Sequence, residues 1–161
     1  MIQIVTILLI ASLVGIDQLI KFLVVNQLQP IGEKMLIPGF IQLHYVENDG
    51  AMMGLMQGKT TFMIIAAAAV LIILFALIFS KKIKFGFLYI CLVMVVSGGI
   101  GNIIDRIFRG FVVDYIEVLF VDFYVFNFAD CLVTVSAFLI IGYEIYDLIK
   151  DSKRKKVSTN D

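Results

Sequence analysis

Residues 61–79, TFMIIAAAAVLIILFALIF, contain no charged side chain, no proline and no glycine. About 20 consecutive apolar residues are enough for a helix to cross the hydrocarbon core of a bilayer, so this stretch predicts a transmembrane helix. Three further apolar runs of similar length lie at residues 2–25, 85–104 and 130–149. The sequence therefore predicts a mainly α-helical membrane protein with four transmembrane helices.

The composition of the whole chain agrees with a membrane protein. Of the 161 residues, 61% are hydrophobic and only 16% are charged, which excludes an ordinary soluble globular domain. The formal net charge of zero gives no long-range attraction to a polyanion, so nucleic acid is not expected as a partner. We expect a single integral-membrane domain over residues 1–150 and a polar, disordered cytoplasmic tail at residues 151–161.

Basic residues predict the orientation in the membrane. They fill the link between the second and third runs (KKIK, residues 81–84) and follow the fourth run (KDSKRKK, residues 150–156). Cytoplasmic segments carry an excess of Lys and Arg, so both places are expected on the cytoplasmic side. Both termini are then cytoplasmic, and the two long connections, residues 26–60 and 105–129, face the outside.

The two outer connections have the character of β-strands. Residues 41–45 (IQLHY) alternate apolar and polar side chains, which predicts a short amphipathic strand. The second connection is rich in β-branched and aromatic residues, which also favour strands. We therefore expect a small extracytoplasmic sheet lying on the helical bundle.

Asp17 is unusual because it lies inside the first predicted helix, about 12 Å from its outer end at 1.5 Å per residue. An ionised carboxylate in the middle of the membrane costs at least ~2.5 kcal/mol. Lys21 follows one turn later on the same helical face and can pair with it. The two residues either form a structural ion pair that fixes the helix against its neighbours, or they contact a substrate directly.

The outer end of the third predicted helix reads SGGIGNIIDR, residues 97–106. Ser97 and Gly101 are small residues one turn apart, which allows another helix to approach closely. Polar side chains then crowd the membrane boundary: Asn102, Asp105 and Arg106. Helix packing followed by an interfacial charge pair explains each residue alone, and a functional role is equally compatible with the pattern.

Asp114 and Asp130 are the strongest candidates for catalysis. Asp130 starts the fourth predicted helix, where a carboxylate can accept backbone N–H bonds as a cap; Asp114 lies between apolar neighbours and has no such explanation. Both are expected at the same depth on the outer side. If they meet in a poorly hydrated site, they share one proton, as in aspartyl proteases. One carboxylate then activates water, the other protonates the peptide carbonyl, and the pair titrates as a unit.

Other catalytic classes have weaker support. A Cys131–His44 or Ser97–His44 pair depends on the single histidine, which has no orienting neighbour in the sequence. A zinc site needs three or four ligands, which His44, Cys91 and Cys131 do not supply at suitable spacing. Carboxylates can bind a divalent cation, but nothing in their spacing requires it.

Two non-catalytic functions stay open. A small proton-coupled carrier would line its pathway with the intramembrane Asp17 and Lys21, and it would need water access from both faces. A membrane scaffold would tolerate conversion of every carboxylate to the amide.

Five short motifs occur in order along the four predicted spans: DQxxK at 17–21, NxGA at 48–51, GNxxDR at 101–106, VVDY at 112–115 and FNxAD at 126–130. Together they resemble the lipoprotein signal peptidases, the signal peptidase II family. The likeness covers nearly the whole chain apart from the C-terminal tail. Each motif is weak alone, but five in this order at suitable membrane depth are highly specific.

The resemblance implies a bacterial inner-membrane aspartyl endopeptidase that removes the signal peptide of a prolipoprotein just before its diacylglyceryl-modified cysteine. It implies no metal or organic cofactor, with the prolipoprotein and membrane lipid as partners and the chain as a monomer. In that family the Asp of VVD and the Asp of FNxAD form the catalytic dyad, here Asp114 and Asp130. Cyclic peptide antibiotics such as globomycin block members of the family, so inhibition is implied as well.

By the same resemblance, a group of residues would hold the substrate or orient the dyad: Asn48, Gly50, Asn102, Arg106 and Asn127. Asp17 and Lys21 would stabilise the site from the first helix. The family's β-cradle would correspond to the strand around Leu43, and its outer flap to the apolar loop after Arg106. The chain departs from the family in having Met52 and Met53 where an aromatic residue is common, Asp49 at a variable position, and Cys131 where Ser is common.

Overall fold

The structure is a computed structural model that describes residues 1–50, 59–80 and 82–158, with side chains described through Ser152. Its elements are α1 (Ile2–Gln27), β1 (Glu33–Ile37), β2 (Ile41–Asn48), α2 (Thr60–Phe79), α3 (Phe87–Phe108), β3 (Val112–Val118) and α4 (Phe128–Ser158). All four helices are long and apolar enough to cross a membrane. The prediction of a mainly α-helical, multi-pass membrane protein with a small sheet is confirmed.

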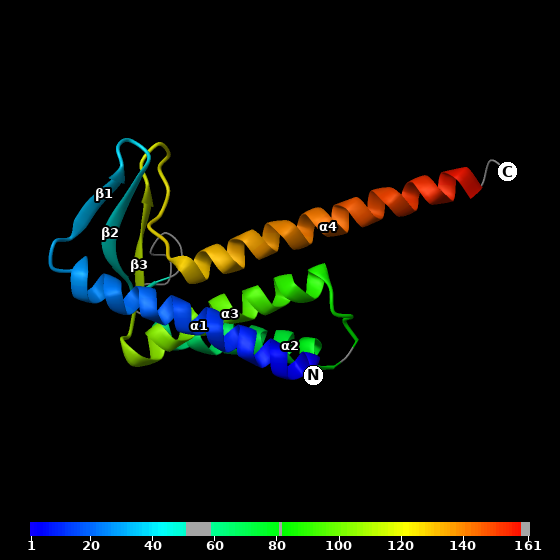
Figure 1. The fold of residues 1–161 in the computed structure, drawn as a ribbon, viewed down its shortest axis with the longest axis horizontal. Helices are drawn as coiled ribbons and strands as arrows, with labels where there is room; N and C mark the ends of the chain where they lie inside the picture. The colour runs from blue at the N-terminus through cyan, green and yellow to red at the C-terminus, as the bar shows by residue number, and fades with distance from the viewer. Residues whose placement is uncertain (51–58, 81, 159–161) are drawn as a thin grey trace.

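Helix α3 lies at the centre of the bundle and packs against α1, α2 and α4 (Figure 1). Glycines allow this close packing. A Cβ atom on Gly98 would collide with the backbone carbonyl oxygen of Ala129 in α4, and one on Gly101 would collide with the carboxylate of Asp17 in α1. Ser97, expected to act with Gly101, instead donates its hydroxyl to the carbonyl of Val93 in its own helix, at 2.8 Å. The small-residue pair that α3 uses is thus Gly98 and Gly101.

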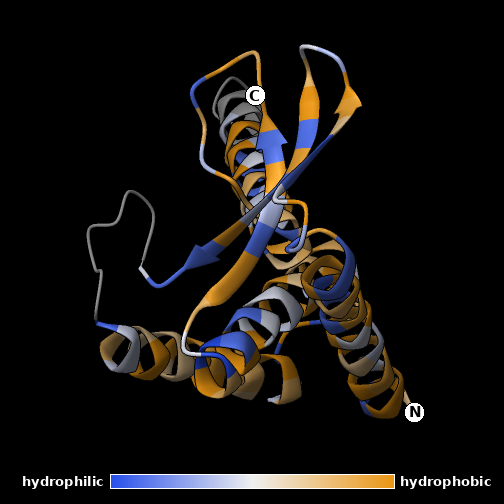
Figure 2. Cartoon of the chain, turned by 90° about the vertical axis from the view of Figure 1, so that its left-hand side faces the viewer, coloured by the Kyte–Doolittle hydropathy of each residue, from blue (hydrophilic) through white to orange (hydrophobic). Residues whose placement is uncertain are grey.

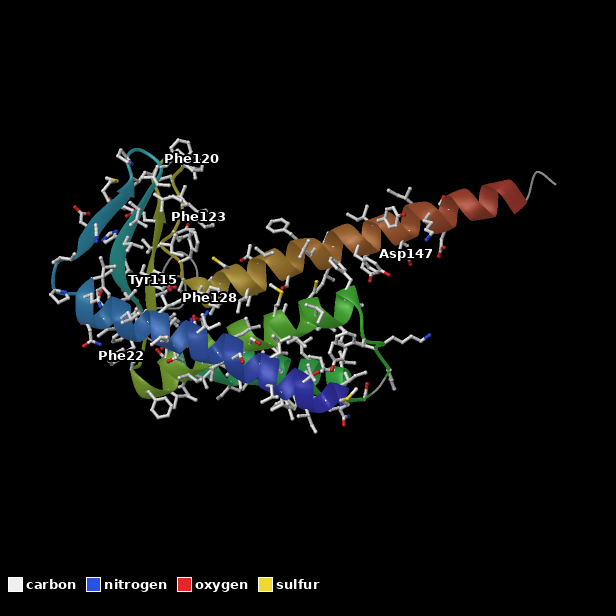
Figure 3. The ribbon with its side chains drawn as sticks, in the orientation of Figure 1. Phe22, Tyr115, Phe120, Phe123, Phe128 and Asp147 are labelled. Carbon is white, nitrogen blue, oxygen red and sulfur yellow. The ribbon has the colours of Figure 1, made fainter. Side chains whose placement is uncertain are left out.

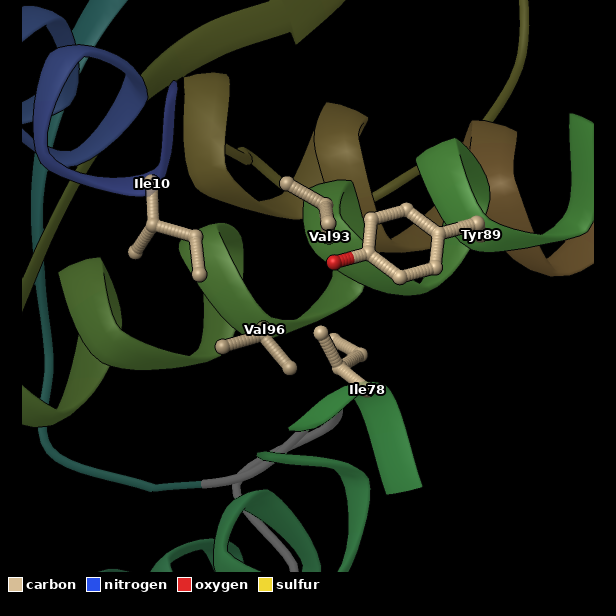
Figure 4. Packing of buried hydrophobic residues seen from close by; sticks show 5 residues of the cluster. All are labelled: Ile10, Ile78, Tyr89, Val93 and Val96. Atoms are coloured by element: carbon tan, nitrogen blue, oxygen red, sulfur yellow. The ribbon is translucent and has the colours of Figure 1, made fainter. Parts of the chain in front are cut away.

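The bundle encloses an apolar cluster at the end away from the sheet. Its fully buried members come from α1, α2 and α3 and are shown in Figure 4: Ile10, Ile78, Tyr89, Val93 and Val96. The hydroxyl of Tyr89 is hydrogen-bonded to the hydroxyl of Thr6, at 2.7 Å, so this buried polar group is satisfied. The cluster fixes α1 and α2 against α3.

The three strands form an antiparallel sheet in the order β1-β2-β3 at one end of the bundle, while the N- and C-termini lie toward the other end (Figure 1). Hydrophilic segments are frequent in the strands and their connections, whereas the helices are mainly hydrophobic (Figure 2). Val113 and Tyr115 of β3 pack against Val24 and Leu28, which anchors the sheet to α1 and the residue that follows it. The apolar loop after Arg106, which the resemblance assigns to a flap, contributes strand β3.

Register within the sheet brings together two of the five motifs that carry the family resemblance, NxGA and VVDY. Val46 of β2 pairs with Asp114 of β3, and Asn48 pairs with Val112. The side chain of Asn48 therefore lies beside that of Asp114, although the two residues are far apart in the sequence. The sheet thus positions both Asn48 and Asp114 at the end of the helical bundle.

Two helices extend beyond their expected bounds. Helix α3 continues one turn past residue 104, which places Asp105 and Arg106 on the helix. Helix α4 continues to Ser158, so residues 151–158 are helical where a disordered tail was expected, and the rest of the expected tail, 159–161, lies outside the described residues. Lys and Arg are good helix formers and are favourable at the C-terminal end of a helix dipole, which explains the extension through the basic residues 150–156.

Candidate active site

Asp114 and Asp130 reach the same end of the bundle from different elements. Asp114 lies on β3 and is only 1% exposed; Asp130 lies in the first turn of α4 and is half-buried. The backbone N–H of Asn127 donates to Asp130 Oδ2, at 3.2 Å, and the N–H of Asp130 donates to Asn127 Oδ1, at 3.0 Å. This reciprocal pair is a capping box in which Asn127 is the N-cap residue and Asp130 completes the box from the first turn of α4. Its other carboxylate oxygen is left for a further partner.

Three asparagine side chains connect the two carboxylates. Asn127 Nδ2 donates to Asp114 Oδ1 at 2.6 Å, and Asn48 Nδ2 donates to Asp114 Oδ2 at 2.8 Å. Asn102 Nδ2 donates to Asp130 Oδ1 at 2.8 Å. Asn127 Nδ2 also lies 3.2 Å from Asn102 Oδ1, so the two amides are themselves linked. Both aspartates therefore belong to one hydrogen-bond network.

Lys21 supports this network from α1 and is completely buried. Its Nζ lies 2.9 Å from Asp17 Oδ2, 3.0 Å from Asp105 Oδ2 and 2.9 Å from Asn102 Oδ1. An ammonium group has three N–H donors, and these three partners use all of them. No donor remains for a substrate, so the geometry favours the structural ion pair over direct substrate contact.

The position of Lys21 also fixes the orientation of the Asn102 amide. A cation must face the amide oxygen, so the Asn102 NH₂ group is turned toward Asp130. Asp17 acts at the same place, because its Oδ1 accepts the backbone N–H of Ala129, at 3.1 Å, just before Asp130. The buried ion pair thus holds two groups in place: Lys21 holds the side chain of Asn102, and Asp17 holds the backbone N–H of Ala129 at the start of α4.

Arg106 links the end of β2 to α3. Its guanidinium group lies 3.4 Å from the carbonyl oxygen of Gly50 and 3.4 Å from that of Asn102. The N–H of Gly50 donates to Asn48 Oδ1, at 3.1 Å, which orients the Asn48 amide toward Asp114. Met52 and Met53, where the chain departs from the family pattern, lie outside the described residues.

The electrostatic environment raises the pKa of Asp114 well above the usual value for an aspartate. The pKa of Asp114 is raised to about 7, mainly by burial and then by the negative charge of Asp130. Hydrogen bonds from Asn48 and Asn127 partly oppose this shift. A carboxyl group of this kind is still partly protonated at pH 7. Asp114 is therefore able to hold a proton at a pH where an ordinary aspartate does not.

Asp105 is the residue that the sequence interpretation missed. An interfacial charge pair was one of the two interpretations left open for it, but Asp105 is completely buried and lies 3.0 Å from Lys21 Nζ. Its position one turn after Gly101, on the face that meets Asp17, was the available signal. Gln18 belongs to the same cluster, since its Nε2 lies 3.2 Å from Asp17 Oδ2 and 3.1 Å from the carbonyl of Gly101.

Other candidate residues lie apart from this network. Glu117 accepts hydrogen bonds from Gln42 and His44, at 2.5 Å and 2.8 Å, and Asp122 is exposed. Because His44 is bonded to Glu117, and Ser97 is bonded within its own helix, the structure gives no support to a Ser–His or Cys–His pair. In the part of the chain that the structure describes, no three His, Cys, Asp or Glu side chains are grouped to hold a metal ion.

A pair of linked carboxyl groups with one proton between them can perform acid–base hydrolysis. The ionised group can accept a proton from water, and the protonated group can donate to the oxygen of a polarised carbonyl. The asparagine amides hold the carboxylates in place without adding charge.

Comparison with known proteins agrees with this chemistry. The model of the family described as Signal peptidase (SPase) II matches residues 9–146. The lipoprotein signal peptidase of Caldanaerobacter subterraneus subsp. tengcongensis is 42% identical over 139 residues, covering 85% of this chain and 92% of the relative. That of Clostridioides difficile is 40% identical over 141 residues, covering 87% and 94%.

Solved structures are similar over the same extent. Two structures described as a bacterial membrane enzyme have TM-scores of 0.78 and 0.78, with 32% and 33% identity. They cover 94% and 89% of this chain, and the chain covers 91% and 94% of theirs. With the family match spanning most of the chain, the conclusion is direct: the chain belongs to the signal peptidase II family.

Proposed function

We propose that the protein is an aspartyl endopeptidase that cleaves the signal peptide of a prolipoprotein immediately before its diacylglyceryl-modified cysteine, with Asp114 and Asp130 as the catalytic dyad. The relatives named lipoprotein signal peptidase support the substrate class. The observation that carries the assignment of the dyad is the role of Asn127. Its side chain donates to Asp114 and its backbone N–H donates to Asp130, so one residue holds both carboxyl groups.

In the proposed mechanism a water molecule attacks the peptide carbonyl preceding the cysteine. The ionised carboxylate of the dyad takes a proton from the water as its oxygen bonds to the carbonyl carbon, and the protonated carboxyl group donates its proton to the carbonyl oxygen. The tetrahedral intermediate then collapses. The dyad gives a proton to the cysteine nitrogen, the C–N bond breaks as the C=O bond re-forms, and one hydroxyl group of the intermediate returns its proton to the dyad, so the amine leaves and the dyad again holds one proton. The roles belong to the pair as a unit.

The location of the dyad suits a lipid-linked substrate. A signal peptide is an apolar helix, and lipidation of the cysteine places the scissile bond at the membrane interface. Asp114 and Asp130 lie where the sheet meets the bundle, at the opposite end from the termini (Figure 1). With the termini cytoplasmic by the positive-inside rule, the dyad faces the outer side of the inner membrane.

Membrane lipid is proposed as a second partner, and a monomer as the working form. Phe120 and Phe123, which follow β3, are 65% and 51% exposed (Figure 3). Phe120 also packs against Phe40 of the β1–β2 turn, with ring centroids 5.2 Å apart. Large apolar side chains that are exposed on a membrane protein mark a surface that contacts lipid or another protein. One chain supplies both aspartates and all three asparagines of the network, so no second copy is needed.

The proposed function is tested by the mass of the cleavage product. Purified protein in detergent is incubated with a prolipoprotein carrying the diacylglyceryl group and with the same prolipoprotein lacking it. The lipidated substrate is expected to yield a mature chain that begins with the lipidated cysteine, whereas the unmodified one is expected to be cleaved at least about tenfold more slowly, because remote binding energy is lost. Cleavage at another bond, or none with several lipidated substrates, contradicts the proposal.

The pKa of Asp114 predicts the pH dependence of cleavage. The mechanism needs one proton on the dyad, and a pKa of about 7 means that this proton is lost as the pH rises through that value. The value of kcat/KM is expected to fall about tenfold for each pH unit above the dyad's apparent pKa. A constant kcat/KM from pH 6 to about 9, with the protein folded throughout, would show that no such proton is used.

A further inference from the structure

Four hydrogen-bond donors converge on the completely buried carboxylate of Asp105. Its Oδ2 lies 3.0 Å from Lys21 Nζ and accepts the backbone N–H of Val113 at 3.1 Å. Its Oδ1 lies 3.4 Å from Gln18 Nε2 and 3.5 Å from Arg109 Nε. Two cationic groups and two neutral donor groups thus surround this buried carboxyl group. The carboxylate therefore joins α1, α3 and β3 at one point.

The hydrogen bond from the Val113 N–H to Asp105 stabilises the free edge of β3, because β3 is the last strand of the sheet and pairs with β2 along its other edge. On that edge, Asp114 is in register with Val46. On the other edge, the N–H of Tyr115 donates to the carbonyl of Phe126, at 3.0 Å, and the N–H of Val113 donates to Asp105. Among the residues that the structure describes, the sheet ends at β3, and this second edge carries only the isolated bridge between Ile116 and Phe126. The carboxylate of Asp105 takes the place that the carbonyl of a neighbouring strand would have.

We propose that Asp105 is a positioning residue for the catalytic dyad, acting through the Val113 N–H to hold the backbone of Asp114 against the buried ion pair of α1. The inference rests on the proposed function, because it assigns a role toward the same dyad. Val113 is directly joined to Asp114, so a shift of its peptide moves the Asp114 carboxylate relative to Asn127 and Asn48. Asp105 itself contacts neither aspartate of the dyad in the described residues.

The test compares Asp105→Ala, which removes the acceptor, with Asp105→Asn, which keeps an oxygen acceptor for the Val113 N–H but not the charge. Displacement of a catalytic group by about 1 Å can cost about 10²-fold in rate. We therefore expect kcat per folded enzyme to fall about 10²-fold in Asp105→Ala and about tenfold in Asp105→Asn, with KM within about twofold of wild type. Asp122→Asn, an exposed aspartate after β3, is the matched control and keeps the wild-type kcat.

A second measurement reports on the backbone without using activity. Amide hydrogen exchange at Val113 is expected to accelerate in Asp105→Ala, to accelerate less in Asp105→Asn, and to stay unchanged in Asp122→Asn, because only the first change removes the acceptor. This readout also covers the case in which Asp105→Ala does not fold, since Asp105→Asn retains the acceptor.

Three results would overturn the inference. The first is a wild-type kcat per folded enzyme in both Asp105 variants, which would reduce the residue to a role in stability. The second is a rise in KM with kcat unchanged, which would place Asp105 in substrate binding. The third is unchanged exchange at Val113. If wild-type protein cleaves nothing, the proposed function fails, and exchange at Val113 still decides whether Asp105 positions the strand.

Discussion

Asp114→Asn is expected to lower kcat by about 10⁴-fold, the upper end of what proton transfer by a positioned side chain contributes, while the protein stays folded. The amide is close in size to the carboxyl group, and it fits the space between Asn127 and Asn48. It can neither accept a proton from water nor donate one to a carbonyl. The measurement is the rate of cleavage of a diacylglyceryl-modified prolipoprotein by purified variants, with thermal unfolding as the check on the fold.

The control for this prediction is Asp122→Asn, which makes the same chemical change at an exposed position. It is expected to cleave at the wild-type rate. An Asp114→Asn variant that keeps a substantial fraction of the wild-type kcat would remove Asp114 from the catalytic pair, whatever its effect on KM.

Lys21→Met is expected to produce the largest loss of stability. The substitution keeps much of the length of the side chain but removes the charge that Asp17 and Asp105 share, so two buried carboxylates lose their main cation. Removing one partner of a buried ion pair costs about 3–5 kcal/mol. Cleavage should fall as well, because Asn102 loses the donor that orients its amide. The measurement is the free energy of unfolding in detergent, together with kcat per folded enzyme.

Lys34→Met is the matched control, because Lys34 lies exposed on β1. Its unfolding should match that of the wild type. If Lys21→Met unfolds like the control, the buried ion pair does not hold the site together, and the alternative of direct substrate contact regains support.

The helical part of the fold could be predicted from the sequence because it depends on local composition. Residues 61–79 are apolar throughout, and the observed α2 spans Thr60–Phe79. The alternation at residues 41–45 likewise predicted β2. Strand β1 had no such signal, since its residues EKMLI become a strand only by pairing with β2. The end of α4 was misjudged because polarity was taken as disorder, although Lys and Arg favour helices.

The part of the site that could be predicted from the sequence consists of carboxylates in apolar segments, because burial of such a group is costly and indicates a role. Asp17, Asp114 and Asp130 stood out for this reason. Asp105 did not, because its neighbour Arg106 offered a simple charge pair in the sequence. The structure turns Asp105 toward Lys21 and Val113 instead. The partners of Asp105 are determined by packing between α1, α3 and β3. The spacing of residues within one helix does not predict such contacts.

The roles of the asparagines also depend on contacts between distant elements. The three amides come from different elements, namely Asn48 on β2, Asn102 on α3 and Asn127 at the start of α4. They reach the two aspartates only because the sheet packs against the helical bundle. Each amide has one oxygen and one NH₂ group. Lys21 orients the amide of Asn102, the capping box orients that of Asn127, and the Gly50 N–H orients that of Asn48. The family resemblance identified these three residues from the sequence motifs. The orientation of each amide could be determined only from the structure.

The most direct test of the dyad is the rate of prolipoprotein cleavage by Asp114→Asn, Asp130→Asn and the double variant, each compared with wild type per folded enzyme. Residues that act as one catalytic unit are strongly non-additive, so removing both costs little more than removing either. We predict that each single variant loses nearly all activity and that the double variant is no slower than the slower single one. Losses that multiply in the double variant, or a wild-type rate in either single variant, would contradict a dyad of Asp114 and Asp130.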